Sequence, residues 1–241
     1  MLGRDMGSRP PDTNTGRRLR NVVVAWSGGK DCALALYHTL AQTHLKVAGL
    51  LTTITEDYGR VSMHGVREVL LEEQAKALGL PLFKVGISAN CSNSEYEEKM
   101  REMLAHLRGR GVEGVVFGDI FLEDVRAFRE KNLASVGMRG AFPLWGKKSQ
   151  QVADDFIRLG FKAVVVCVDT EVLNATFAGR EFNEEFLRML PANIDPCGEN
   201  GEFHTFVYDG PIFRWSVGFE RGRVVLREER FCFCDLLPCR H

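Results

Sequence analysis

Val22-Val23-Val24-Ala25-Trp26-Ser27-Gly28-Gly29-Lys30-Asp31-Cys32 is the most informative segment of the chain. Its opening apolar run predicts a buried strand, and apolar residues recur at helical spacing over 33–41, which predicts a helix. Adjacent glycines at such a junction let backbone N–H groups approach an anion, and the helix N-terminus adds unpaired N–H groups of its own. The segment therefore predicts a phosphate-binding loop.

The side chains of this loop suit a phosphate held with magnesium. Ser27 can donate a hydroxyl, Lys30 supplies a positive charge, and Asp31 can hold Mg²⁺ directly or through water. Neither the Walker A spacing nor Gly-x-Gly-x-x-Gly is present. A plain Gly-Gly turn is the alternative, but open α/β sheets bind ligands at a strand-to-helix junction of this kind, which favours a functional loop.

Residues from 21 to about 170 alternate apolar runs with helix-period stretches. Strands are expected at 22–26, 47–53, 82–87, 115–117 and 163–168, and helices at 66–78, 94–107 and 150–159. The near-continuous Val, Ile and Leu content of the strands suits a parallel sheet covered on both faces. We expect an α/β nucleotide-binding domain over residues 21–172, with the helix after residue 93 opening on a Ser94 and Glu97 capping box.

The flanking regions have a different character. Residues 1–20 are rich in Gly, Pro and Arg and are expected to form a disordered leader, while Asp5 and Asp12 argue against a transit peptide. After residue 172 we expect a short helix (181–190), a loop (191–201) and strands at 203–208, 212–219 and 224–227. Residues 173–241 therefore predict a smaller α+β domain that completes an active site.

Composition limits the functional class. The chain has 241 residues, 45% of them hydrophobic, and a formal net charge of -1, which argues against a nucleic-acid or membrane-surface binder. No apolar run approaches the roughly 20 residues of a membrane span. The seven cysteines are an odd number without a Cys-x-x-Cys pair, which suits a reducing cytoplasm and disfavours zinc.

The Ser-Gly-Gly-Lys-Asp segment after a first buried strand resembles the PP-loop of ATP pyrophosphatases, in the adenine nucleotide alpha hydrolase-like superfamily. The resemblance implies a Rossmann-like (HUP) fold and an enzyme that cleaves ATP between its α and β phosphates. That loop usually ends in Ser, where this chain has Cys32. A thiol is a weaker hydrogen-bond donor than a hydroxyl, so one phosphate contact is expected to be lost or taken over by the backbone.

Further motifs resemble the diphthine-ammonia ligase branch of that superfamily. Thr53 and His64 match a region that lies near the adenosine in the branch, and Gly118, Arg126 and Glu130 match a second motif. The third match is the run Gly198-Glu199-Asn200-Gly201-Glu202-Phe203-His204-Thr205, followed by Asp209-Gly210-Pro211. The branch usually has Glu in place of His204, and Phe128 replaces a second Arg. The resemblance therefore supports the use of ATP more strongly than it supports the identity of the acceptor substrate.

The resemblance implies a two-step ligation with ATP and Mg²⁺. ATP adenylylates a carboxylate, pyrophosphate leaves, and ammonia attacks the acyl-adenylate to give an amide. Lys30 and Asp31 would act on the phosphates, and Arg126 would clamp an anionic group. The acceptor is expected to be a modified-histidine protein or a small carboxylic acid.

Several side chains keep two interpretations. Glu199 and Glu202 lie in a Gly/Asn-rich loop, which favours orienting the acceptor or ammonia over plain charge pairing. His204 is either a general base or a strand residue, and His64 either contacts adenosine or is a solvated loop histidine. Cys197 is a nucleophile only if a partner base lies near it.

Two other functional classes remain open. An RNA-modifying PP-loop enzyme would need a basic channel for tRNA, which the neutral net charge does not favour. A nucleotide sensor would bind ATP without cleaving it. Lys30 and Asp31 argue against a sensor, because binding alone does not require both charged groups. The sequence also leaves a homodimer open.

Overall fold

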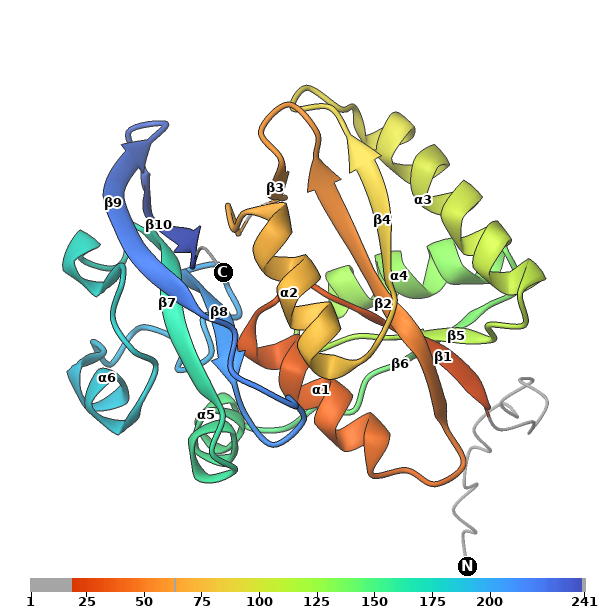
Figure 1. The fold of residues 1–241 in the computed structure, drawn as a ribbon, viewed down its shortest axis with the longest axis horizontal. Coiled ribbons are helices and arrows are strands. Elements are labelled where there is room, and N and C mark those ends of the chain that lie inside the picture. Colours follow the sequence, from red (N-terminus) through yellow and green to blue (C-terminus); the bar gives the residue numbers. More distant parts are fainter. Residues whose placement is uncertain (1–18, 63, 240–241) are drawn as a thin grey trace, which may run out of the picture.

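A computed structural model describes residues 19–62 and 64–239. They form two β-sheets with helices packed around them (Figure 1). The predicted leader lies, up to residue 18, outside the described residues. None of the described helices is long and apolar enough to cross a membrane.

The first sheet has five parallel strands: β1 (Asn21–Ala25), β2 (Lys46–Thr55), β4 (Leu82–Ile87), β5 (Gly114–Val116) and β6 (Arg139–Ala141). They are ordered β4-β2-β1-β5-β6, and the short β3 (Arg60–Val61) pairs antiparallel with the end of β2. The strand order reverses between β1 and β5, as in doubly wound nucleotide-binding sheets. The predicted α/β, Rossmann-like fold class is confirmed.

Strand alternation explains why the first sheet is buried on both sides. Val22 and Val24 join one apolar cluster with α1 (Lys30–Leu40) and α2 (Glu68–Leu78). Val23 joins a second cluster with α3 (Asn93–Gly109) and α4 (Glu123–Ser135). Consecutive strand residues point to opposite faces. Because all three valines are fully buried, helices must cover both faces, as Figure 1 shows.

The second sheet is antiparallel and contains β7 (Lys162–Asp169), β8 (Phe203–Asp209), β9 (Phe219–Arg227) and β10 (Phe231–Pro238), in the order β8-β7-β10-β9. Around it lie α5 (Ser149–Arg158), the 3₁₀ turn η1 (Ala175–Phe177) and α6 (Glu184–Met189). The prediction that 163–168 belongs to the parallel sheet is wrong. An apolar run buried on both faces does not reveal the direction of its neighbours. The domain boundary expected at residue 172 stays a prediction.

Some local expectations also need correction. The strand expected at 212–219 does not form, because β8 ends in a turn at Gly210, whose N–H donates to Asp209 Oδ1, and β9 begins only at Phe219. Helix α3 is capped by Ser92, whose side chain accepts from the Glu95 N–H at 3.2 Å, and not by Ser94. Helix α4 was not anticipated because it buries only one residue, Leu133, so its apolar period is weak.

Candidate functional site

The loop after β1 lies where the strand order of the first sheet reverses. The backbone turns at Gly28, with φ of +82°, directly into α1. On the neighbouring side, Gly118 follows β5 and faces the start of this helix. A Cβ at position 118 would lie 2.7 Å from the carbonyl carbon of Asp31, so only glycine permits this approach. The predicted loop and Gly118 therefore meet at the edge where open α/β sheets bind ligands.

A buried glutamine outside the predicted site residues holds the loop in place. Gln74 of α2 is fully buried and accepts from Trp26 Nε1 at 2.9 Å. Its Nε2 donates to the Gly28 carbonyl at 3.0 Å and to the Val207 carbonyl at 2.5 Å. The signal was available, because Gln74 is a polar residue at helical spacing on an otherwise apolar face. Strand β8 adds a bond from the Val207 N–H to the Gly28 carbonyl.

The N-terminus of α1 is suited to an anion. Its N-cap, Gly29, contributes no side-chain cap. Thr205 of β8 accepts from the Lys30 N–H at 3.0 Å, and the first turn of a helix has further N–H groups without acceptors inside the helix. Such groups attract phosphate. Contact of Ser27, Gly28 and Gly29 with a triphosphate stays a prediction that this geometry favours.

Lys30 is the buried cation of the site, with only 3% of its surface exposed. Its Nζ donates to Asp31 Oδ2 at 2.8 Å and to the Cys197 carbonyl, and it lies 5.4 Å from the centroid of the Phe203 ring. Burial is the largest single influence and acts to lower the pKa of Lys30, but the charge and hydrogen bond of Asp31, together with Cys197 and Glu199, outweigh it and leave that pKa above its ordinary value. Lys30 therefore carries its charge at neutral pH.

Asp31 has one carboxylate oxygen that no described residue engages, and its role as a magnesium ligand stays a prediction. Its Oδ1 is buried and has no hydrogen-bond partner among the described residues, while burial raises the pKa of this carboxyl despite Lys30. A hard cation suits such an oxygen. The described part of the chain contains no group of three or more His, Cys, Asp or Glu side chains arranged to hold a metal. A magnesium ion at Asp31 would therefore take other ligands from phosphate and water.

Cys32 and Ser27 face one another at the loop. The two side chains lie 3.7 Å apart, and the Cys32 thiol donates to the Gly29 carbonyl at 3.0 Å. Burial raises the pKa of this thiol, so it remains protonated. Its hydrogen is already engaged in the turn, so it is not free for a phosphate oxygen in this geometry. Its predicted nucleotide contact stays a prediction.

The loop over residues 195–202 is tied together by two carboxylates. Asp195 Oδ1 accepts from the N–H groups of Cys197 (2.9 Å) and Glu199 (3.1 Å). Glu202, which is buried, accepts from the Asp195 N–H and from both the N–H and the side chain of Asn200. The structure thus places Glu202 as a support for the loop that carries Glu199. A role of Glu202 toward the acceptor stays a prediction.

Glu199 reaches from this loop to the first sheet. Its Oε1 accepts from the Ile120 N–H at 2.7 Å, just beyond Gly118. Burial raises the pKa of Glu199 to about 7, and the nearby negative charges of Asp31 and Asp119 add to the effect. A carboxyl group that titrates near neutral pH can take up or release a proton during a reaction. Glu199 is therefore the candidate acid or base of the site.

The rings of His64 and His204 contact one another beside the loop, tilted by 36°. Their ring centroids are 4.3 Å apart, and a Cβ placed on Gly29 would lie 3.5 Å from His64 Nε2. Burial and neighbouring Lys30 lower the pKa of His204 to about 4, and burial and His204 hold the pKa of His64 well below its usual range. Both rings are neutral at pH 7. His64 Nδ1 is buried without a partner among the described residues, so a ligand donor can reach it only by displacing a neighbour.

Thr53 is linked through its backbone to the connection that carries His64. It stands near the carboxyl end of β2, and its carbonyl accepts from the Ser62 N–H at 3.2 Å. This bond ties the connection that carries His64 to the first sheet. Adenosine contact by Thr53 and His64 stays a prediction.

Arg126, which lies on α4, contacts two aromatic rings and Glu130. Its guanidinium lies 4.8 Å from the Phe142 ring centroid and 4.6 Å from that of Trp145, and its Nε donates to Glu130 at 2.9 Å. The anion clamp predicted for Arg126 stays a prediction. Three residues further along α4, Arg129 pairs with Asp119, with 2.8 Å between Nε and Oδ2.

Cys197 is not poised as a nucleophile. Its thiol donates to the Ser149 carbonyl at 3.3 Å, and burial raises its pKa far above the ordinary value. A nucleophilic cysteine needs the thiolate and a nearby base. The alternative role considered for Cys197 therefore finds no support in the site.

Comparison with known proteins identifies the family. The diphthamide synthase N-terminal domain matches residues 20–140, and the diphthamide synthase C-terminal domain matches residues 148–235. The chain is 27% identical to the diphthine-ammonia ligase of Schizosaccharomyces pombe, over 90% of this chain but only 39% of that protein. It is 23% identical to the ligase of that name from Mus musculus and 24% identical to the one from Homo sapiens, each over 85% of both chains. Two adjoining domain models and relatives aligned across most of its length show that the chain belongs to the diphthamide synthase family.

Proposed function

We propose that this chain is a cytoplasmic ATP-dependent ligase that adenylylates a substrate carboxylate, releases pyrophosphate and forms an amide with ammonia. The observation that carries the proposal is the pair Lys30 and Asp31 at the N-terminus of α1, at the point where the strand order reverses. Relatives that are named diphthine-ammonia ligases support the ligase class. A sensor that binds ATP without cleaving it would not need this arrangement of charges.

The first step would transfer AMP to the acceptor. A carboxylate oxygen attacks the α-phosphorus of ATP, the bond to the bridging oxygen of pyrophosphate breaks, and pyrophosphate leaves with its electron pair. The N–H groups at the start of α1 and the charge of Lys30 would stabilise the leaving pyrophosphate. Magnesium held at Asp31 would supply further positive charge to the phosphate oxygens.

The second step would form the amide. Ammonia attacks the acyl carbon, the bond from that carbon to the AMP oxygen breaks, and one proton leaves the nitrogen. Glu199 is suited to accept that proton because its pKa is about 7 and it lies near Asp31 in the same site. Glu202 and Asp195 would keep Glu199 in place through the loop hydrogen bonds.

The acceptor is the least constrained part of the proposal. The names of the relatives point to diphthine, a modified histidine, on a protein. The chain spans 39% of the Schizosaccharomyces pombe ligase, whose remaining length has no counterpart in the match. We propose a diphthine-bearing protein as the acceptor and retain a small carboxylic acid as the alternative.

An isotope experiment tests both steps. The chain is incubated with Mg-ATP, ¹⁵N-ammonium and an acceptor whose carboxylate carries ¹⁸O, and the nucleotide and amide products are analysed by mass spectrometry. We expect AMP with one ¹⁸O atom, pyrophosphate, and an amide containing ¹⁵N. ADP and phosphate as the only nucleotide products would contradict adenylylation, and ATP that binds without any cleavage would favour the sensor.

A further inference from the structure

The connection between β3 and α2 carries His64, and those of its residues that the structure describes lie outside the helices and strands. Its position therefore depends on contacts made by its ends and its backbone. At one end stands Arg60 of β3, and at the other stands Arg67, the N-cap of α2. Both arginines reach the second sheet.

Asp235 of β10 receives both guanidinium groups. Arg67 donates from Nε to Oδ1 at 3.1 Å and from Nη2 to Oδ2 at 2.6 Å, which is a two-point contact. Arg60 Nη2 lies 3.0 Å from Oδ1, and Arg60 Nη1 donates to the Gly65 carbonyl at 2.5 Å. Paired contacts of this kind restrict orientation as well as distance. Asp235 thus links the second sheet to both ends of the connection.

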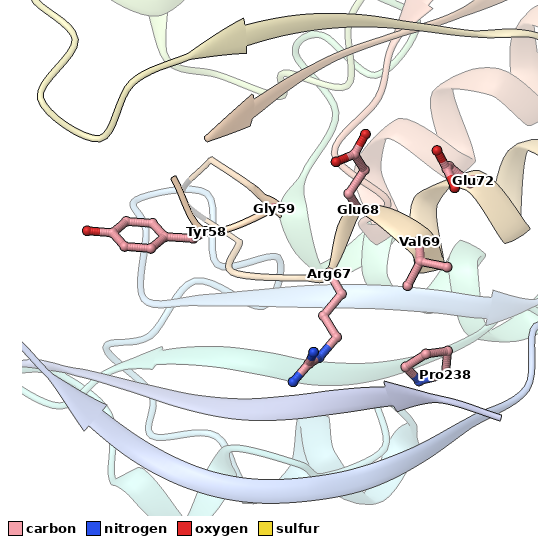
Figure 2. Close-up of a pocket in the computed structure, with 7 residues that line it drawn as sticks. All are labelled: Tyr58, Gly59, Arg67, Glu68, Val69, Glu72 and Pro238. Atoms are coloured by element: carbon pink, nitrogen blue, oxygen red, sulfur yellow. The ribbon is translucent and has the colours of Figure 1, made fainter. Parts of the chain in front are cut away.

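Packing against β10 holds the middle of the connection. A Cβ on Gly65, whose φ is +68°, would lie only 2.7 Å from Phe233 Cδ1. Phe233 lies two residues before Asp235 on the same face of the strand. Figure 2 shows Arg67 directed toward the β9 and β10 strands, while Glu68 and Glu72 point away from them. The connection therefore packs against β10 in addition to its backbone hydrogen bond to β2 of the first sheet.

We propose that Asp235 is a positioning residue, which acts through Arg60 and Arg67 to hold the His64 ring against His204 beside the phosphate loop. The 4.3 Å contact between the two ring centroids and the approach of His64 Nε2 to Gly29 depend on where the connection lies. The consequence for turnover rests on the proposed function, whereas the consequence for the position of the ring does not.

Asp235 is ionised under ordinary conditions, as the contact requires. Partial burial alone would raise its pKa, but the hydrogen bonds from Arg67 and Arg60 outweigh burial and hold the pKa of Asp235 below its usual range. Replacing the carboxylate by an amide of the same shape removes the charge and one acceptor oxygen. Asp235→Asn therefore releases the two arginines with little change in volume.

A chain-matched control is available in the same sheet. Arg230 makes a two-point contact with Asp169 of β7, at 3.0 Å from Nε to Oδ1 and 2.5 Å from Nη2 to Oδ2. Asp169→Asn removes the same chemistry without touching the connection that carries His64. Both variants should lower stability, so a difference between them reports on position.

The experiment measures two quantities in the full chain. The first is the rate at which diethyl pyrocarbonate modifies His64, followed by peptide mapping. The second is the KM for ATP in AMP formation. For Asp235→Asn we expect modification to rise roughly fivefold, because the ring leaves its contact with His204, and the KM to rise roughly tenfold with a smaller change in kcat. Asp169→Asn should leave both near the wild-type values, and Asp235→Glu should restore much of each.

Unchanged His64 reactivity in Asp235→Asn, or an equal rise in Asp169→Asn, would overturn the proposal. If Asp235→Asn does not fold, Arg67→Gln replaces it, because that change removes the contact of Arg67 with Asp235 and leaves the contact of Arg60 in place. If no variant, including the wild type, forms AMP, the proposed function fails while the modification rates still decide the role of Asp235.

Discussion

Replacing Glu199 with glutamine should change how the stability of the protein depends on pH. The folded-state pKa of Glu199 is about 7 against an ordinary value of 4.5, because the carboxyl is buried. Between these two values the folded state binds more protons than the unfolded state. Stability contributed by this group is therefore present at low pH and is lost as the pH rises toward 7.

The magnitude follows from the two pKa values. If the whole difference between the folded-state and unfolded-state pKa values applied, the free energy of unfolding would fall by about 2.5 kcal/mol between pH 5 and pH 8. The side chain is partly exposed to solvent, so we expect about 1.5 kcal/mol. His64 and His204 act with the opposite sign, because their pKa values are lowered. The comparison with Glu199→Gln isolates the carboxyl, since both proteins keep the histidines.

Urea unfolding at pH 5 and pH 8 provides the measurement. The wild type should lose about 1.5 kcal/mol more than Glu199→Gln as the pH rises. In the AMP-forming reaction, the wild-type rate should fall below about pH 7 as Glu199 becomes protonated, and the variant should lose that limb. Identical pH dependence of stability in the two proteins would refute the assignment of a buried, raised pKa to Glu199.

Three further changes test other parts of the site. Lys30→Met should reduce the rate of AMP formation by at least about 100-fold. The control is Lys162→Met, which removes an ion pair on the surface. A Lys30→Met rate within a few-fold of the wild type would remove Lys30 from the mechanism. Gly118→Ala should destabilise the protein by about 2 kcal/mol, because the added Cβ would meet the Asp31 backbone. Gly109→Ala should not destabilise it, because a Cβ at position 109 meets open space. Calorimetry on the two variants measures the difference. Between pH 7 and pH 5, His204→Gln should lose about 1 kcal/mol less stability than the wild type. The reason is that His204 has a folded-state pKa of about 4, so at pH 5 it takes up a proton when the wild type unfolds. Equal losses in urea titrations would contradict a buried neutral ring.

The part of the fold that the sequence determined is local. Strand β1, the Gly-Gly turn and helix α1 lie within twenty consecutive residues and were predicted to within one residue at most ends. Strand and helix periodicity and the backbone freedom of glycine act between neighbours in the chain. The same is true of the parallel order of the first sheet, since each strand is followed by a helix that returns the chain.

Tertiary structure decided which distant groups meet. Glu199 accepts from the Ile120 N–H across 79 positions of sequence, and the Lys30 N–H donates to Thr205 across 175. The sequence places Gln74 on the apolar face of its helix, but only the fold brings its amide to the Gly28 carbonyl. The raised pKa of Glu199 and the lowered pKa of His204 arise from burial, which no local pattern specifies.

The second sheet shows the same division most clearly. The apolar run of β7 predicted a strand buried on both faces, and the strand is present. Its partners β8 and β10 run antiparallel to it, and β10 brings Asp235 to the connection that carries His64. Hydrophobic patterning records that a strand is buried but not which strands bury it, because apolar contact is non-directional and the pairing is chosen only when the whole chain packs.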